Sequence, residues 1–203
     1  MDTNNPKNFS FTLLDGTIFH LCRGVPQVVL VVNTASRCGF ARQFDTLQKL
    51  YDRYRAHGFT VLGVSSQSFG KQEFDRACDI EAAIKNKCSA ITFPITQLTA
   101  VRGKAIHPFY AWAATQVSLL GRPKWNFHKY LIGKDGRCIT WFASAIDPLA
   151  PKVIAAVEAA PICFMCSVRL CSLQGVGHYS HLIPRCNSMI QFKICCYKHN
   201  RTQ

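Results

Sequence analysis

The chain has 203 residues, of which 48% are hydrophobic and 17% are charged, and its formal net charge is +13. This length supports one compact domain, and no run of about 18 apolar residues suggests a transmembrane helix. The first residues, MDTNNPKNFSF, lack a basic start followed by an apolar block, so we expect a cytoplasmic protein without a secretory signal. The basic charge favours a solvated surface over a nucleic-acid interface, because no nucleic-acid motif accompanies it.

The first half of the chain has the pattern of a hairpin followed by a strand–helix–strand unit. FSFTLLDGTIFHL alternates around Asp15-Gly16, which is typical of a hairpin. PQVVLVVNTA and FTVLGVSS are apolar on both faces, as buried parallel strands are. Between them, the apolar spacing predicts a helix from Gln43 that ends at Gly58.

The second half continues with helices and one more hairpin. KQEFDRACDIEAAIKNK predicts a helix over residues 71–87, and ITFPIT an extended segment. HPFYAWAATQ predicts a short helix with Pro108 in its first turn. A hairpin over residues 125–143 turns at 134–136, and a helix within 147–160 follows. We therefore expect an α/β fold, a central mixed β-sheet with helices on both faces.

The composition changes after residue 160, so we expect a domain over residues 1–160 and a poorly ordered Cys-rich basic tail over 161–203. The tail holds six of the eleven cysteines and none of the eleven acids. Cys163-x-x-Cys166 invites a zinc interpretation, but no second regular pair follows, so we expect no metal site. The run ICFMCSVRLC has some apolar character, but Arg169 interrupts it, so we do not expect membrane contact. An odd, scattered set of cysteines does not predict a disulfide framework.

One cysteine, Cys38 in NTASRCGF, lies where the first buried strand meets the following helix. The N–H groups at a helix start favour the thiolate, which is the nucleophilic form of cysteine. A buried thiol that only packs is the alternative. The position alone leaves both interpretations open.

Three blocks of sequence in order resemble the glutathione peroxidase family: VVLVVNTASRCGFARQFDTLQKLYDRYRAHGFTVLG, then FGKQE, then WNFHKYLIGKDG. The resemblance covers about residues 8–160. It implies a thioredoxin-like three-layer sandwich and a thiol-dependent peroxidase that reduces hydrogen peroxide or organic hydroperoxides in the oxidative stress response. It also implies that Cys38 is the peroxidatic residue, oxidised to a sulfenic acid, with no bound cofactor.

The same resemblance assigns Trp125 and Asn126 as donors around the sulfur. At the family's Asn-Gln-Phe-Gly motif this chain has QSFG, so Gln67 matches the Asn and Ser68 matches the Gln. Ser68 has a shorter side chain than Gln, so we expect reduced or redirected activity unless Gln67 turns inward.

The family's usual resolving cysteine is also absent, because its positions hold Lys85 and Asn86. Cys78 and Cys88 are the nearest candidates, and otherwise glutathione or thioredoxin would reduce Cys38 directly. The short connection before WNF resembles the monomeric members of the family.

Two rival functions remain on the same fold. A dithiol–disulfide oxidoreductase would need a Cys-x-x-Cys at the helix start, where only Cys38 is present. A non-enzymatic redox sensor or metal-binding module is the alternative, and the altered QSFG motif and the tail are its best arguments.

Overall fold

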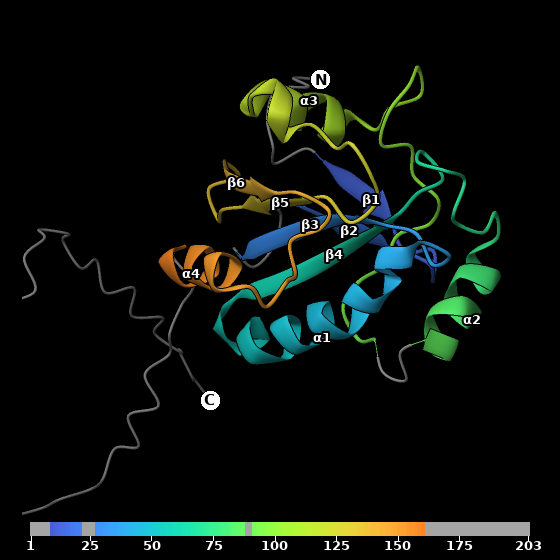
Figure 1. The fold of residues 1–203 in the computed structure, drawn as a ribbon, viewed down its shortest axis with the longest axis horizontal. Coiled ribbons are helices and arrows are strands. Elements are labelled where there is room, and N and C mark those ends of the chain that lie inside the picture. Colours follow the sequence, from blue (N-terminus) through green and yellow to red (C-terminus); the bar gives the residue numbers. More distant parts are fainter. Residues whose placement is uncertain (1–8, 22–26, 88–90, 161–203) are drawn as a thin grey trace, which may run out of the picture. The chain divides into compact units, whose positions relative to one another are not determined.

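The computed structural model describes residues 9–21, 27–87 and 91–160 (Figure 1). The strands are β1 (Ser10–Thr12), β2 (Ile18–His20), β3 (Val28–Thr34), β4 (Phe59–Ser65), β5 (Lys129–Ile132) and β6 (Cys138–Phe142). The α-helices are α1 (Gln43–Tyr54), α2 (Ala77–Lys87), α3 (Pro108–Gln116) and α4 (Pro151–Ala159). Their order along the chain is the predicted one.

The central sheet has the strand order β4-β3-β5-β6. Strand β3 pairs parallel with β4 and antiparallel with β5, and β5 pairs antiparallel with β6. The prediction of a mixed sheet is therefore confirmed. Both β3 and β4 are buried along their whole length, as the apolar runs indicate.

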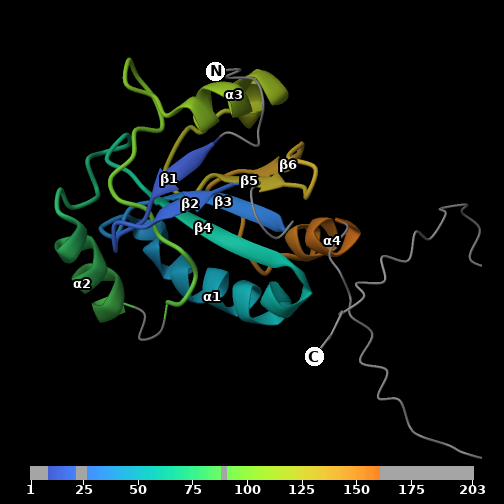
Figure 2. The ribbon, with the colours of Figure 1, turned by 180° about the vertical axis from the view of Figure 1, so that it is seen from behind.

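The sheet separates two apolar layers. One layer packs β3 residues such as Val32 against α1 and α4, and the other packs Val31 against α3 and the β1–β2 hairpin. The two opposite views show α1 and α4 together on one side of the sheet and α3 on the other (Figures 1 and 2). The expected helices on both faces are thus present.

The two hairpins and three of the helices agree with the sequence pattern. The β1–β2 and β5–β6 hairpins are both antiparallel. Gly58 has a φ of +78°, which suits a glycine that ends the helical segment. The segment 91–96 contributes only isolated bridges, at Ile95 and Thr96.

Helix α2 starts later than predicted. It begins at Ala77, whereas the sequence pattern predicts a start at Lys71. Lys71 has a φ of +48°, which is incompatible with a right-handed helix. The carbonyls of Lys71 and Glu73 accept hydrogen bonds from the Arg37 guanidinium, at 3.0 and 2.9 Å. Side-chain contacts across the fold therefore replace the first helical turns that the sequence pattern predicts.

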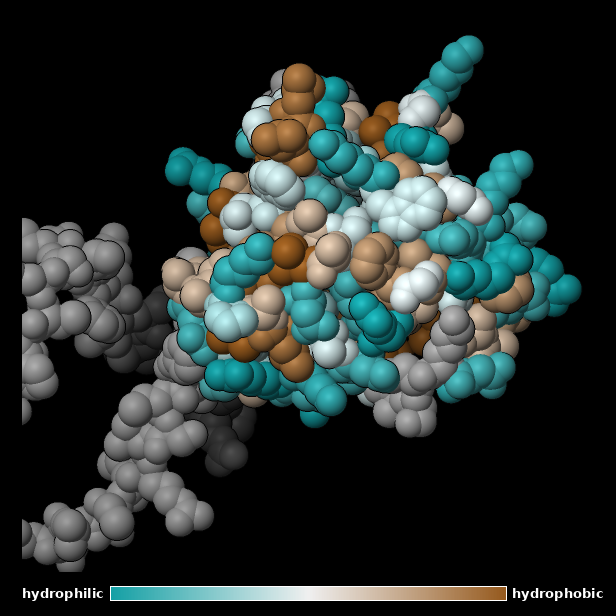
Figure 3. All heavy atoms as spheres, viewed as in Figure 1, coloured by the Kyte–Doolittle hydropathy of each residue, from teal (hydrophilic) through white to brown (hydrophobic). Residues whose placement is uncertain are grey.

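The surface is mixed in character, with hydrophilic and hydrophobic residues interspersed over the face shown in Figure 3. Within the described ranges, no helix combines the length and the apolar character needed to cross a membrane. The expected tail over 161–203 lies outside the described residues, and with it the candidate zinc ligands.

Candidate active site

Cys38 caps the short 3₁₀ helix Gly39–Arg42, which continues directly into α1. The turn after β3 is closed by a hydrogen bond from the Cys38 N–H to the Ala35 carbonyl, at 3.1 Å. The Phe40 N–H points at Cys38 Sγ across 3.5 Å. A backbone donor aimed at a sulfur stabilises negative charge that develops there, so this turn suits a reactive thiolate.

The Cys38 side chain is largely buried, with 4% of the residue exposed, yet it lines a surface hollow. Arg37 and Arg42 line the same hollow, as does Asp45. A small oxidant can therefore reach the sulfur from one side while the protein encloses the other. The two guanidinium groups make this approach favourable for anionic partners.

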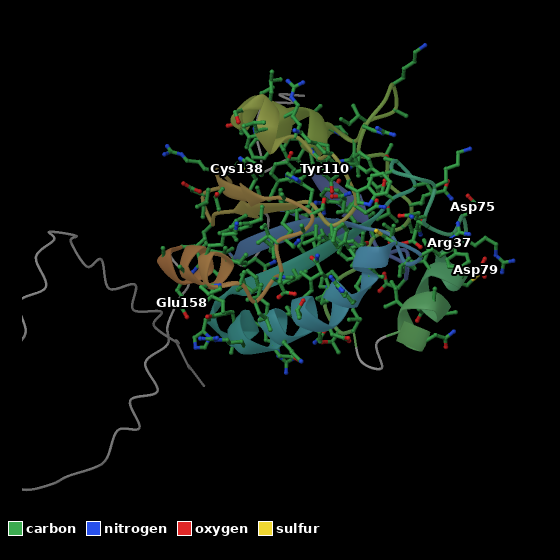
Figure 4. All side chains as sticks on the ribbon, in the orientation of Figure 1. Arg37, Asp75, Asp79, Tyr110, Cys138 and Glu158 are labelled. Carbon is green, nitrogen blue, oxygen red and sulfur yellow. The ribbon has the colours of Figure 1, made fainter. Side chains whose placement is uncertain are left out.

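The loop over residues 67–75 clamps the turn that carries Cys38. Glu73 is completely buried, and its carboxylate accepts hydrogen bonds from the Ser36 N–H, at 2.9 Å, and from the Ser36 hydroxyl. Burial raises the pKa of the Glu73 carboxyl. The Arg37 N–H donates to the Gln72 carbonyl at 3.0 Å, and Figure 4 shows Arg37 at the same end of the molecule as Asp75 and Asp79.

The segment from Trp125 to Phe127 is fixed beside the end of β3. The Asn33 side-chain amide donates to the Trp125 carbonyl at 3.1 Å, and the Phe127 N–H donates to the Asn33 carbonyl at 2.5 Å. The fold thus brings Trp125 and Asn126 to the strand end that leads into Cys38. Trp125 is 40% exposed and its ring lies 6.1 Å from that of Phe69.

Asn126 is completely buried, and its amide faces the loop over residues 67–75. Its Nδ2 donates to the Phe69 carbonyl at 3.2 Å and to the Gln72 side-chain oxygen at 3.1 Å. Its Oδ1 is buried without a hydrogen-bond partner among the described residues. Asn126 therefore links this loop to the segment beside β3.

At the altered motif, the Ser68 hydroxyl is turned towards Val101 of another loop, and the Gln67 amide is turned towards its own loop. Ser68 Oγ accepts from the Val101 N–H at 2.9 Å, and the Ser66 hydroxyl lies 3.0 Å away. Gln67 Nε2 donates to the Glu73 carbonyl at 3.1 Å and to the Asp75 carboxylate at 2.7 Å. Gln67 thus braces the loop that holds Ser36.

The described part of the chain contains no hydrogen bond from Trp125, Asn126, Ser68 or Gln67 to the Cys38 sulfur. The donor that reaches it, the Phe40 N–H, is one of the N–H groups expected at the helix start, whereas the contacts of Gln72 and Glu73 were not predicted from the sequence. An acidic residue in a helix-like stretch is expected to face solvent, so the burial of Glu73 had no signal.

The other described cysteines differ in exposure. Cys78 is exposed on the first turn of α2, and the Arg76 guanidinium lies 3.0 Å from its sulfur. Cys138 is partly buried in β6, and burial raises the pKa of its thiol to about 11, which makes it a poor nucleophile near neutral pH. The second resolving candidate, Cys88, lies outside the described residues. No three His, Cys, Asp or Glu side chains in the described ranges are grouped as metal ligands.

Comparison with known proteins connects this arrangement to one family. The family model for glutathione peroxidase matches residues 7–114. A glutathione peroxidase homolog BsaA from Halalkalibacterium halodurans is 38% identical, with 71% of this chain and 92% of that protein covered. A hydroperoxy fatty acid reductase from Synechocystis is 35% identical, with 71% and 90% covered.

Solved structures give the same result for the fold. The crystal structure of Trgpx in its apo form is 33% identical, with a TM-score of 0.59 and coverage of 77% of this chain and 97% of that chain. A thioredoxin-family thiol:disulfide interchange protein from Chlorobium tepidum shares the fold at 15% identity, with a TM-score of 0.55 and coverage of 75% and 92%. The chain therefore belongs to the glutathione peroxidase family and is a thiol-dependent peroxidase on a thioredoxin-like fold.

Proposed function

We propose that Cys38 is the peroxidatic residue of this enzyme. Its thiolate attacks the terminal oxygen of the hydroperoxide, the O–O bond breaks, and the leaving oxygen takes a proton to become water or an alcohol. Cys38 is left as a sulfenic acid. The observation that carries the proposal is the Phe40 N–H aimed at a sulfur that lines an open hollow.

Trp125 completes the site as a donor to the charge that develops during oxygen transfer, and Asn126 joins it when its amide releases the Phe69 carbonyl or the Gln72 side chain. Their backbone is fixed to the end of β3 through Asn33, so they remain close to the turn that carries Cys38. Ser68 is the third donor in place of a glutamine. Gln67, whose amide is occupied by Glu73 and Asp75, supports the loop.

The proposed substrates are hydroperoxides, with a preference for organic ones. A hollow of about 290 Å³ lies next to the site, since Phe40 and Trp125 both line it. Leu120 and Trp141 add apolar surface, and Arg122 adds positive charge at the same hollow. This combination suits an apolar chain with an anionic end, and the Synechocystis relative is named a hydroperoxy fatty acid reductase.

Glutathione or thioredoxin then reduces the oxidised Cys38. Glutathione would attack the sulfenic acid, release water and leave a mixed disulfide that a second glutathione cleaves. In the thioredoxin route, the Cys78 or Cys88 thiol would form a disulfide with Cys38 first. We further propose that the enzyme acts as a cytoplasmic monomer in the oxidative stress response.

Hydroperoxide consumption by the purified protein tests these assignments, with glutathione and thioredoxin supplied in separate reactions. We expect Cys38→Ser to abolish consumption with both reductants and the matched control Cys138→Ser to retain it. Consumption by Cys38→Ser at the unmodified rate would refute the assignment. Leu120→Ser should slow the reaction with a long-chain fatty acid hydroperoxide but not with hydrogen peroxide.

A further inference from the structure

The central sheet contains a lysine, Lys129 of β5, with no exposed surface. It pairs with Val32 of β3 and with Phe142 of β6. Because side chains alternate along a strand, Lys129 shares the face of Leu131, which is the layer covered by α1 and α4. Burying a cation in an apolar layer costs free energy unless hydrogen bonds or an opposite charge offset the loss of hydration. The contacts of Lys129 are therefore informative.

The Lys129 amino group makes one hydrogen bond, to the carbonyl of Phe127 at 2.7 Å. No carboxylate of the described residues lies within ion-pair distance of it, and burial lowers its pKa to about 7. The charge of Asp147 acts in the opposite direction. The adjacent His128 stays neutral near pH 7, because burial lowers its pKa to about 4.

The acceptor residue, Phe127, has an unusual backbone. Its φ of +65° is rare and unfavourable for a bulky side chain, and the residue is completely buried. Its N–H is held by the Asn33 carbonyl and its C=O by Lys129. Both polar groups of the strained residue are therefore fixed, directly after Trp125 and Asn126.

We propose that Lys129 is a positioning residue of the peroxidase site, holding the left-handed turn at Phe127 so that Trp125 and Asn126 stay beside the Cys38 turn. The inference rests on the proposed function, because the position of these two side chains matters for catalysis only if they act on the peroxide. Among the described residues, no hydrogen bond joins Lys129 to the Cys38 sulfur, and Lys129 does not line the hollow of about 290 Å³.

Lys129→Met tests the inference, because methionine keeps most of the side-chain length and removes the donor. We expect the oxidation of Cys38 to slow by about tenfold or more, since a misplacement of about 1 Å can cost about 10²-fold in rate. The melting temperature at pH 6 should stay equal or rise, because an unpaired buried cation is gone. The matched control Lys49→Met removes an exposed lysine of α1 and should change neither quantity.

The pH profile separates positioning from simple packing. The rate ratio of wild type to Lys129→Met should fall severalfold as the pH rises through about 7, because the neutral amine is the weaker donor to Phe127. A ratio of one at every pH would overturn the inference, as would a slow variant whose ratio does not change with pH.

An NMR measurement keeps the inference separate from the proposed function. In a Cys38→Ser background, the Trp125 indole and Asn126 amide signals should shift in Lys129→Met. In the same background with Lys129 retained, the chemical shifts of these two signals should change with pH around pH 7. Unmoved signals would overturn the positioning role, even if Cys38 proves to be peroxidatic. Shifted signals, together with no peroxide consumption by the protein that keeps Cys38, would instead reject the proposed function alone.

Discussion

The residue at which we expect this site to differ from its family is Ser68, which matches the glutamine of the family motif in the sequence resemblance. Its hydroxyl oxygen accepts from the Val101 N–H at 2.9 Å, so the side chain is directed by the loop beyond it. Glutamine reaches farther and presents two N–H donors. The loss of one such donor typically slows a reaction by about 10²–10³-fold, although Trp125 and Asn126 remain here.

We therefore expect Ser68→Gln to speed the oxidation of Cys38 by about tenfold, with little effect on its reduction. Rapid mixing with a hydroperoxide, followed by tryptophan fluorescence over a single oxidation, separates the two steps. Gln67→Asn is a useful companion, because it changes the neighbouring amide while Ser68 remains. Slower or unchanged oxidation in Ser68→Gln would show that the site is organised around serine.

Glu73 makes the stability of the Cys38 turn depend on pH. Burial raises the pKa of its carboxyl in the folded protein above the ordinary value of 4.5. The folded state therefore binds the proton more tightly than the unfolded state. The contribution of the Glu73 carboxyl to the free energy of unfolding is greatest below pH 4.5. It is lost as the pH rises through the raised pKa.

Glu73→Gln provides a reference without this titration. The free energy of unfolding of the wild type, minus that of Glu73→Gln, should decrease as the pH rises from below 4.5 to above the raised pKa. Urea unfolding at pH 4 and at pH 7 measures it. An increase of this difference with pH would mean that the Ser36 contacts outweigh the burial of the charge.

At the scale of elements, the sequence correctly predicts the strands and helices whose apolar residues follow directly from which faces are buried. The strands β3 and β4 are continuous apolar runs because both of their faces are covered, and α1 shows its buried face at helical spacing. The predicted start of α2 was wrong because Arg37 and Glu73 form contacts across the fold. Contacts between residues far apart in the chain leave no trace in the local sequence pattern. The side-chain contacts of Ser68 and Gln67 had no sequence signal for the same reason.

The short α2 has a consequence for the resolving step. Cys78 lies on its exposed first turn, whereas Cys38 is largely buried, so we expect a disulfide between them to form only when the start of α2 unwinds. We expect peroxide treatment without added thiol to give a Cys38–Cys78 disulfide, detected by non-reducing peptide mapping. Cys88→Ser should leave this disulfide unchanged, and Cys78→Ser should remove it. A Cys38–Cys88 disulfide would assign the resolving role to the other candidate.

At the scale of the molecule, the described fold closes with α4. Val153 and Val157 of this helix are completely buried and complete the apolar layer to which α1 also contributes. We therefore expect a chain shortened to residues 1–160 to unfold cooperatively and to retain peroxidase activity. Thermal unfolding and peroxide consumption of both lengths test this. Loss of cooperative unfolding in the shorter chain would place residues beyond 160 in the core.

The central claim concerns the identity of the oxidised atom. The most direct measurement mixes the reduced full-length protein with a limiting amount of hydroperoxide, traps sulfenic acid with a specific probe and maps the labelled peptide by mass spectrometry. We predict that Cys38 carries the label first, in proportion to the peroxide consumed, while Cys78 and Cys138 stay unlabelled. Peroxide consumption with the first label on any other cysteine would contradict the account.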